Sequence, residues 1–249
     1  METMKKQIYH IFFRLLAVLL LTTSCLGDID NAPKGWLQVG RPSTDSATVS
    51  RTTGTGEIDY RISILRGNDV VMYPTRYSSF SGRIPLSAST SYTLLAESCS
   101  EAEAEQRPTS YGQPRYAGSE PFVIVANEST SVTVNCSMAN AAFCIRKDEF
   151  FYYTQFTVSA TVNGRTLYFT DEDRMGYFNV GEDGTATLHY EVEAIDASGL
   201  IGRGSGTLQL KRRNLSKLWL KATPQGGLDV SIKYDDTFTP VVTNIEITE

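Results

Sequence analysis

Short alternations of hydrophobic and polar positions dominate the chain past residue 35. Because successive side chains of a strand point to opposite faces, these alternations predict β-strands with one buried face. No stretch there has a sustained helical period, and we expect one helical turn near residues 148–153. The expected strands are residues 36–39, 58–65, 70–73, 83–86, 91–97, 122–125, 131–136, 156–162, 166–169, 177–180, 187–194, 206–210, 217–221, 228–233 and 242–247.

Two turn signals organise these strands. Asn163-Gly164 predicts a tight hairpin, and residues 66–69 (Arg-Gly-Asn-Asp) predict another, since Gly and Asn tolerate a positive φ. The two halves align loosely, each with a strand, a tight turn and a returning strand. We therefore predict two tandem β-sandwiches, residues 35–140 and 141–249, with their seam near residues 138–148. A single elongated sandwich is the alternative.

The N-terminus has the pattern of an export signal. Lys5, Lys6 and Arg14 precede an uninterrupted apolar run at residues 15–21, and small polar residues follow. That run is too short to cross a bilayer as a helix. Leu-Thr-Thr-Ser-Cys at residues 21–25 resembles a bacterial lipobox, which makes Cys25 the predicted lipidation site.

The lipobox divides the N-terminal part of the chain. Residues 1–24 are the predicted lipoprotein signal peptide, and residues 25–34 are a short flexible tether. Acyl chains such as palmitate on Cys25 would bind the lipid of the outer membrane, since each buried CH₂ contributes about 0.8 kcal/mol. The alternative is a conventional cleaved signal with an incidental cysteine.

Composition narrows the class of protein. Hydrophobic residues make up 41% and charged residues 20%, enough apolar content for a packed core. The net charge is −5 for the whole chain, and it becomes more negative once the three cations of the signal peptide are removed. Since nucleic-acid binding needs a cationic footprint, we expect no nucleic-acid partner.

Catalytic and metal chemistry have few candidates. The chain has two histidines, and after signal cleavage only His189 remains, inside an alternating strand. There is no Gly-x-Ser-x-Gly elbow and no glycine-rich phosphate loop with a following lysine. The acidic residues 171–173 form either a calcium site or, more simply, a solvated loop. We expect no enzyme activity, no catalytic residues, no cofactor and no bound metal.

Two long segments and four tyrosines are candidate binding features. Residues 98–120 and 171–184 are predicted loops, and long loops of sandwiches are common binding sites, although an ordered cover over a sheet edge is the alternative. The tyrosines in or beside loops are Tyr73, Tyr77, Tyr111 and Tyr116. They could stack on sugars or contact a protein, or they could be ordinary corner and core residues.

Three cysteines remain after Cys25. Cys99, Cys136 and Cys144 would face a compartment that permits disulfides, and they allow one bridge in three possible pairings. Cys136 alternates with Val132 and Val134, which is typical of a small buried hydrophobic residue. The sequence alone does not decide whether two of these cysteines form a disulfide.

Several motifs together resemble a known family. They are the lipobox at Cys25 and the segments at residues 35–39 (Gly-Trp-Leu-Gln-Val), 60–64, 91–96, 116–118 and 132–140. The chain resembles a two-part lipoprotein family of gut Bacteroidales that is known only as a domain of unknown function. Its members are similar to fimbrillin-like lipoproteins with a suggested role in cell adhesion, which are built from two transthyretin-like β-sandwiches. None of these motifs is a catalytic signature.

The resemblance implies a lipid-anchored, non-enzymatic protein of the outer membrane, at the cell surface, with an adhesion or fimbria-like structural role. A carbohydrate-binding accessory lipoprotein is the alternative function, so a protein or a glycan is the expected ligand. A fimbrial subunit would need a donor strand, for which residues 241–249 are the candidate. In the same bacterial lineage Asp45-Ser46-Ala47 matches a short O-glycosylation pattern, which makes Ser46 a candidate O-glycosylation site.

Overall fold

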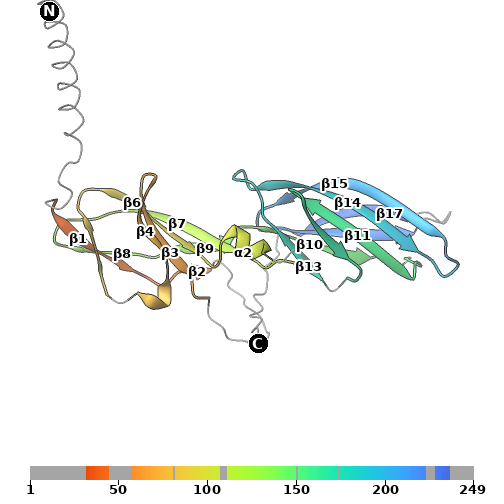
Figure 1. Cartoon of the computed structure of the whole chain (residues 1–249), viewed down its shortest axis with the longest axis horizontal. Coiled ribbons are helices and arrows are strands. Elements are labelled where there is room, and N and C mark those ends of the chain that lie inside the picture. The colour runs from red at the N-terminus through yellow and green to blue at the C-terminus, as the bar shows by residue number, and fades with distance from the viewer. Residues whose placement is uncertain are drawn as a thin grey trace, which may run out of the picture. The chain divides into compact units, whose positions relative to one another are not determined.

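The computed structural model describes residues 32–44, 58–80, 82–106, 111–149, 151–172, 174–222 and 228–235 (Figure 1). Within these residues the regular structure is almost entirely β-strand, which confirms the all-β prediction. The strands form four separate sheets. Among the described residues no helix combines the length and the hydropathy needed to cross a membrane.

The chain divides into two compact units. The first takes in residues up to Gln38 together with Gly82–Ser91 and Val123–Ser131, and the second takes in the rest. Strands from both sides of residue 140 belong to the second unit. The boundary between residues 140 and 141 therefore stays a prediction.

The first unit contains a three-stranded sheet in the order β5-β1-β8. Its strands are β1 (Lys34–Val39), β5 (Ile84–Ser87) and β8 (Ser129–Val132). Leu37 is fully buried, as the alternation of β1 predicts. Gly35 is needed for space, because a Cβ there would lie 2.1 Å from the Val125 carbonyl oxygen.

The second unit begins with a six-stranded sheet in the order β2-β9-β7-β6-β3-β4. Inward positions of β3 and β6 are fully buried, Ile62 and Leu94 among them. The strands are β2 (Ser43–Thr44), β3 (Arg61–Arg66), β4 (Asp69–Arg76), β6 (Ser91–Glu97), β7 (Tyr116–Val123) and β9 (Asn135–Met138). A 3-10 turn, η2 (Tyr77–Ser79), and a short helix, α2 (Glu101–Glu105), complete this part.

The remaining strands of the second unit form a β-sandwich, which we call the C-terminal sandwich. One four-stranded sheet has the order β12-β11-β14-β15 and the other has the order β13-β10-β16-β17. The strands are β10 (Ala141–Lys147), β11 (Gln155–Val162), β12 (Arg165–Phe169), β13 (Met175–Phe178), β14 (Thr185–Ile195), β15 (Ile201–Lys211), β16 (Leu215–Ala222) and β17 (Leu228–Asp235).

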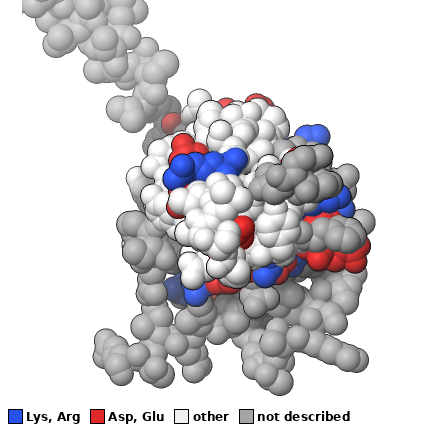
Figure 2. Space-filling model, turned by 90° about the vertical axis from the view of Figure 1, so that its right-hand side faces the viewer, with Lys and Arg blue, Asp and Glu red and all other residues white. Residues whose placement is uncertain are grey.

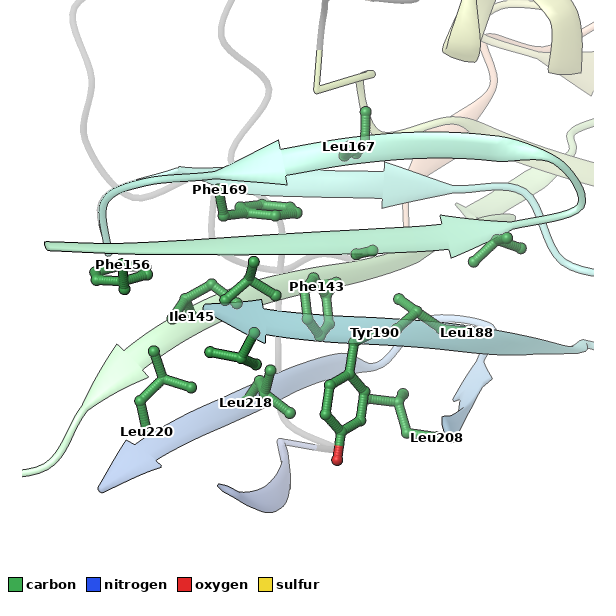
Figure 3. Packing of buried hydrophobic residues seen from close by; sticks show 14 of the residues in the cluster. Phe143, Ile145, Phe156, Leu167, Phe169, Leu188, Tyr190, Leu208, Leu218 and Leu220 are labelled. Atoms are coloured by element: carbon green, nitrogen blue, oxygen red, sulfur yellow. The ribbon is translucent and has the colours of Figure 1, made fainter. Parts of the chain in front are cut away.

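The core of the C-terminal sandwich lies between its two sheets. Aromatic and aliphatic side chains from both sheets interdigitate there (Figure 3). The rings of Phe143 and Phe169 meet edge to face with centroids 5.3 Å apart. Burial of such large side chains contributes about 1.5–3 kcal/mol each, so this cluster is the main source of stability for the C-terminal sandwich.

The predicted seam near residues 138–148 is occupied largely by β10. This strand pairs in parallel with β16 and antiparallel with β13, and its residues Ala141 to Ile145 are all buried. A strand that is buried on both faces has a continuous apolar sequence with no alternation. The sequence analysis therefore missed it.

Both predicted turns are confirmed. Asn163 and Gly164 have φ values of 50° and 82°, as a two-residue hairpin loop requires, and Gly67 has a φ of 59°. The prediction of a helical turn near residues 148–153 is wrong, since the described residues there form no helix. Asp148 instead accepts a 2.9 Å backbone hydrogen bond from Phe151 in a turn, and the α-helix of the described residues is α2.

Two strand boundaries also differ from the prediction. β7 begins at Tyr116, six residues before the expected start. The sequence did not indicate this part of the strand, because residues 117–121 show no alternation of buried and exposed positions and include Gly118. A Cβ at Gly118 would lie 2.2 Å from the Asn135 carbonyl oxygen, so close backbone approach requires glycine there. The expected strand at residues 131–136 is divided between β8 and β9.

Candidate functional site

Several sequence predictions lie outside the described residues. They are the signal peptide at residues 1–24, the lipidation site Cys25, the candidate glycosylation site Ser46, and the expected strand at residues 242–247 within the candidate donor strand at residues 241–249. All of these stay predictions, and the described structure begins seven residues after Cys25.

His189 lies on the solvent-exposed face of β14. Its neighbours across the strands are Thr161 on β11 and Thr207 on β15. The two neighbours on its own face of β14, Thr187 and Glu191, are exposed as well. His189 is thus a surface residue of an alternating strand, as its sequence context indicated.

The acidic loop at residues 171–173 is balanced by cations of the chain. Glu172 pairs with Lys147 at 3.1 Å, and Asp171 pairs with Arg174 at 3.0 Å. The Glu172 carbonyl oxygen also accepts a hydrogen bond from Arg146. Within the described ranges, which leave out residue 173, no group of three acidic, histidine or cysteine side chains could hold a metal ion. Both described carboxylates thus take part in ion pairs, and the contacts of Glu172 fix the loop to β10.

The three described cysteines are buried thiols. Cys99 is 7% exposed, while Cys136 and Cys144 are 0% and 1% exposed. The burial of Cys136 confirms the prediction from its alternation with Val132 and Val134. Their burial shields the thiols from oxidants and from metals in solution, so they are part of the packing.

The four tyrosines occupy different environments. Tyr116 is buried, and burial raises its pKa to about 12. Tyr111 packs edge to face on Phe169 with centroids 5.1 Å apart and donates its hydroxyl to the Tyr168 carbonyl oxygen. Tyr73, on the edge strand β4, is 76% exposed. Tyr77, in η2, is half-buried, and the Arg41 guanidinium lies 6.0 Å from the centroid of its ring. The four tyrosines form no common aromatic platform, since only Tyr73 among them is exposed.

The first long loop, residues 98–120, contains α2 and is held by its own acidic residues. Ser100 begins the helix with a capping box, in which its hydroxyl accepts from the Glu103 N–H at 3.2 Å and Glu103 accepts from the Ser100 N–H at 2.7 Å. Arg61 on β3 donates to the same carboxylate. This ion pair and the hydrogen bonds from Ser100 lower the pKa of Glu103 to about 2.

The neighbouring carboxylates of this loop are engaged as well. Arg115 pairs with Glu97 and Glu101, each at 3.2 Å, and donates to the Cys99 carbonyl oxygen at 3.1 Å. Glu105 accepts the backbone N–H of Asn179 at 2.7 Å. The described part of this segment is therefore ordered, and it is not all loop, since residues 101–105 form α2 and residues 116–120 belong to β7, an inner strand of the six-stranded sheet.

A groove of about 510 Å³ opens on the C-terminal sandwich where four strands begin or end. β11 begins there, and β10, β12 and β14 end there. Its lining residues are Lys147, Tyr153, Thr154, Gln155, Phe156, Thr157, Thr170, Asp171, Glu172, Glu193 and Ile195. The acidic loop singled out in the sequence is thus one wall of a cavity whose other walls the sequence did not indicate.

Charges in and around this groove are paired. Glu193 pairs with Arg203 at 3.0 Å, and the Lys147 ammonium lies 5.9 Å from the centroid of the Phe156 ring. Figure 2 shows a face on which basic and acidic side chains lie next to each other among uncharged ones. Such a surface does not generate the extended field of one sign that steers polyanions.

A comparison with protein families finds one that spans almost all of the described structure. Residues 34–249 match the family described as a domain of unknown function, DUF4493. The chain belongs to this family. The match begins at the first residue of β1, where the folded part described here starts.

Among solved structures, similar ones come from Bacteroides and Porphyromonas species. A candidate cell adhesion protein from Bacteroides eggerthii is 9% identical with a TM-score of 0.49, over 84% of this chain and 97% of that one. A candidate cell adhesion protein from Bacteroides ovatus is 11% identical, with a TM-score of 0.43, over 84% and 99% of the two chains.

A third similar structure is the fimbrial anchor protein Mfa2 from Porphyromonas gingivalis. It is 9% identical with a TM-score of 0.43, over 81% of this chain and 97% of that one. No curated protein matches the chain. At TM-scores below 0.5 these likenesses do not by themselves assign a function.

Proposed function

We propose that this chain is a lipid-anchored protein of the outer membrane, exposed at the cell surface, with a non-enzymatic adhesion or fimbria-like structural role. The observation that carries the proposal is the spacing between the lipobox and the fold. Cys25 ends the apolar signal, and β1 begins at Lys34, nine residues later. Nine residues span at most about 30 Å, so an acylated Cys25 would hold the sandwiches close to the membrane.

The fold suits that role. Antiparallel sandwiches are rigid, and they present strand ends and edges to partners while their cores stay closed. Here the edge strand β4 has three exposed hydrophobic side chains, Val70, Val71 and Tyr73. The descriptions of the similar structures, cell adhesion and fimbrial anchoring, name roles of the same kind. The proposal rests on the anchor and on the fold of this chain.

The anchor is tested by substituting Cys25 with Ala and feeding cells an alkyne analogue of palmitate. We expect the parent chain to take up the label, to remain with membranes, and to be cleaved by protease added to intact cells. The C25A chain should lose the label. Cys99→Ala is the matched control, since Cys99 is a buried thiol of the folded part.

Two results would contradict this proposal. One is equal labelling of the parent and C25A chains, and the other is a labelled parent chain that resists protease on intact cells. The first result would rule out lipidation at Cys25, and the second would rule out exposure of the chain at the cell surface. An adhesion role further predicts that cells without the gene attach less to a mucin-coated surface, and equal attachment would rule out that role alone.

We also propose Ser46 as an O-glycosylation site. The support is the Asp45-Ser46-Ala47 pattern. The intact mass of the chain purified from its own cells should exceed that of Ser46→Ala by the mass of a glycan. A difference equal to one oxygen atom would show that Ser46 is unmodified.

A further inference from the structure

We propose that the groove at the end of the C-terminal sandwich binds a neutral saccharide. The inference is independent of the lipid anchor, and it goes beyond the adhesion role because it assigns a site and a class of ligand. Its basis is one open cavity with paired carboxylates, an exposed tyrosine next to it, and exposed hydroxyl and amide side chains that form no hydrogen bond within the described residues. The volume of about 510 Å³ falls in the range of small-molecule sites.

Polar groups with unused hydrogen-bonding capacity line the groove. Gln155, Thr157 and Thr170 are exposed, and among the described residues their side chains form no hydrogen bond. Hydroxyl and amide groups both donate and accept, as sugar hydroxyls do. Such side chains can therefore satisfy neighbouring hydroxyls of one sugar ring without the cost of desolvating a full charge.

The carboxylates of the groove favour a neutral ligand. Glu193 uses its Oε2 for both contacts with Arg203, and its Oε1 accepts no hydrogen bond from the described residues. The lining residues include three carboxylates and one ammonium group. The three carboxylates pair with Lys147, Arg174 and Arg203. Among the described residues the groove therefore keeps no unpaired lining cation for the carboxylate of a uronic acid or a sialic acid, whereas a neutral hydroxyl can donate to Glu193 Oε1.

One exposed aromatic ring next to the groove offers an apolar surface for the C–H face of a sugar ring. Tyr153 and Phe156 line the groove but are only 5% and 8% exposed and pack into the core, whereas Tyr152, the chain neighbour of Tyr153, is 47% exposed. The rings of Tyr152 and Tyr153 are stacked with centroids 5.0 Å apart and planes 18° apart. This stacking orients Tyr152 before a ligand arrives, which reduces the entropy lost on binding.

The backbone around the groove is fixed. Thr154 donates its hydroxyl to the Ile195 carbonyl oxygen at 3.0 Å, which joins the start of β11 to the end of β14. Glu172 accepts the backbone N–H of Lys147 at 2.5 Å, which joins the acidic loop to the end of β10. The groove is therefore preformed.

The experiment is an NMR titration of the full chain with a panel of disaccharides. Lactose, cellobiose and N,N′-diacetylchitobiose are the neutral probes, and a glucuronate-containing disaccharide of hyaluronan is the anionic one. We expect at least one neutral probe to shift amide signals of residues 153–157, 170–172 and 193–195. The anionic probe should bind more weakly.

Matched variants locate the site. Thr157→Val should weaken binding about 3- to 10-fold, the loss typical of one hydrogen bond. Thr207→Val should leave it unchanged, since Thr207 is an exposed mid-strand threonine of the same sheet that lies outside the groove. Both substitutions are at the surface, so both variants should fold like the parent chain by circular dichroism.

Several outcomes would overturn the inference. They are the absence of binding by any neutral probe at its solubility limit, stronger binding of the anionic probe, and equal weakening by T157V and T207V. A groove that binds a short peptide such as tri-alanine but none of the disaccharides would also overturn it. Each of these results leaves the test of Cys25 unaffected.

Discussion

A single methyl group added at Gly206 tests the packing of the C-terminal sandwich. Gly202, Gly204 and Gly206 alternate along β15 and face the interior of the sandwich. Gly206 lies opposite Tyr190 of β14 in the strand register. A Cβ at Gly206 would lie 2.6 Å from the Tyr190 hydroxyl oxygen and 2.9 Å from its Cζ, closer than van der Waals contact allows.

The expected magnitude follows from two opposing effects. Tyr190 is 8% exposed and belongs to the core cluster, so its ring cannot swing away cheaply (Figure 3). Overfilling such a site costs about 1–3 kcal/mol. Replacing a strand glycine by alanine returns about 0.5–1 kcal/mol in backbone entropy. Gly206→Ala should therefore lower the free energy of unfolding by about 1–2 kcal/mol.

Gly204→Ala is the matched control. It is on the same face of the same strand, and the nearest atom to its added Cβ would be Val230 Cγ2 at 3.3 Å. A methyl end can yield by the few tenths of an ångström required. The small steric cost and the gain in backbone entropy then nearly cancel, so the free energy of unfolding of G204A should be within about 0.5 kcal/mol of that of the parent chain.

Urea unfolding followed by tryptophan fluorescence measures both variants, because Trp219 lies on β16 of the same sandwich. A third variant, Tyr190→Phe with Gly206→Ala, removes the oxygen of the shortest contact. The penalty of G206A should be smaller in that background, as a double-mutant cycle would reveal. Equal stability of G206A and G204A would refute the argument that the Gly206 position has no room for a methyl group. An unchanged loss of stability from G206A in the Y190F background would refute it as well.

Three further predictions concern other elements. The lowered pKa of Glu103 stabilises the fold above pH 4.5, and this stabilisation is lost as the pH falls toward about 2. In urea titrations at pH 6 the free energy of unfolding of the parent chain should therefore exceed that of Glu103→Gln by about 1 kcal/mol, after allowance for solvent screening. Near pH 2 the two free energies should be equal. Gly164→Ala, at a φ of 82°, should cost about 1 kcal/mol by thermal unfolding. Burial raises the pKa of Tyr116 to about 12, so stability should fall as the pH rises from 10 toward 12, and Tyr116→Phe should move the midpoint of alkaline unfolding upward.

The strands with one buried face could be predicted because apolar and polar residues alternate in their sequences as buried and exposed positions alternate in the structure. In β6 the buried residues Tyr92, Leu94 and Ala96 alternate with half-exposed ones, and β14 follows the same rule. The β11–β12 hairpin was predictable from Asn163-Gly164, since few residue pairs accept two positive φ values in succession.

Other elements depend on contacts that no local pattern records. β10 is apolar on both faces because it lies between β13 and β16, and its parallel partner is about 70 residues away in sequence. α2 was missed for a different reason. Its five residues are too few for a helical period, although the capping pattern Ser100-x-x-Glu103 was present in the sequence.

The groove could be predicted only in part, because strand register assembles it. The sequence drew attention to the acidic residues 171–173, yet Lys147, the ion-pair partner of Glu172, belongs to the unrecognised β10. Thr157 and Glu193 lie 36 positions apart and are direct partners in the β11–β14 register. Each of these residues alone is an ordinary polar surface residue.

The same alternation that builds the core also decides the chemistry of the groove. Phe156 and Val158 face the core cluster, so Thr157 must face outward. On β14 the burial of Val192 and Ala194 directs Glu193 to the same side. A one-residue slip of either strand would bury a polar group at this point and expose an apolar one. The hydrophobic core therefore selects the register, and the register places a hydroxyl and a carboxylate side by side at the groove.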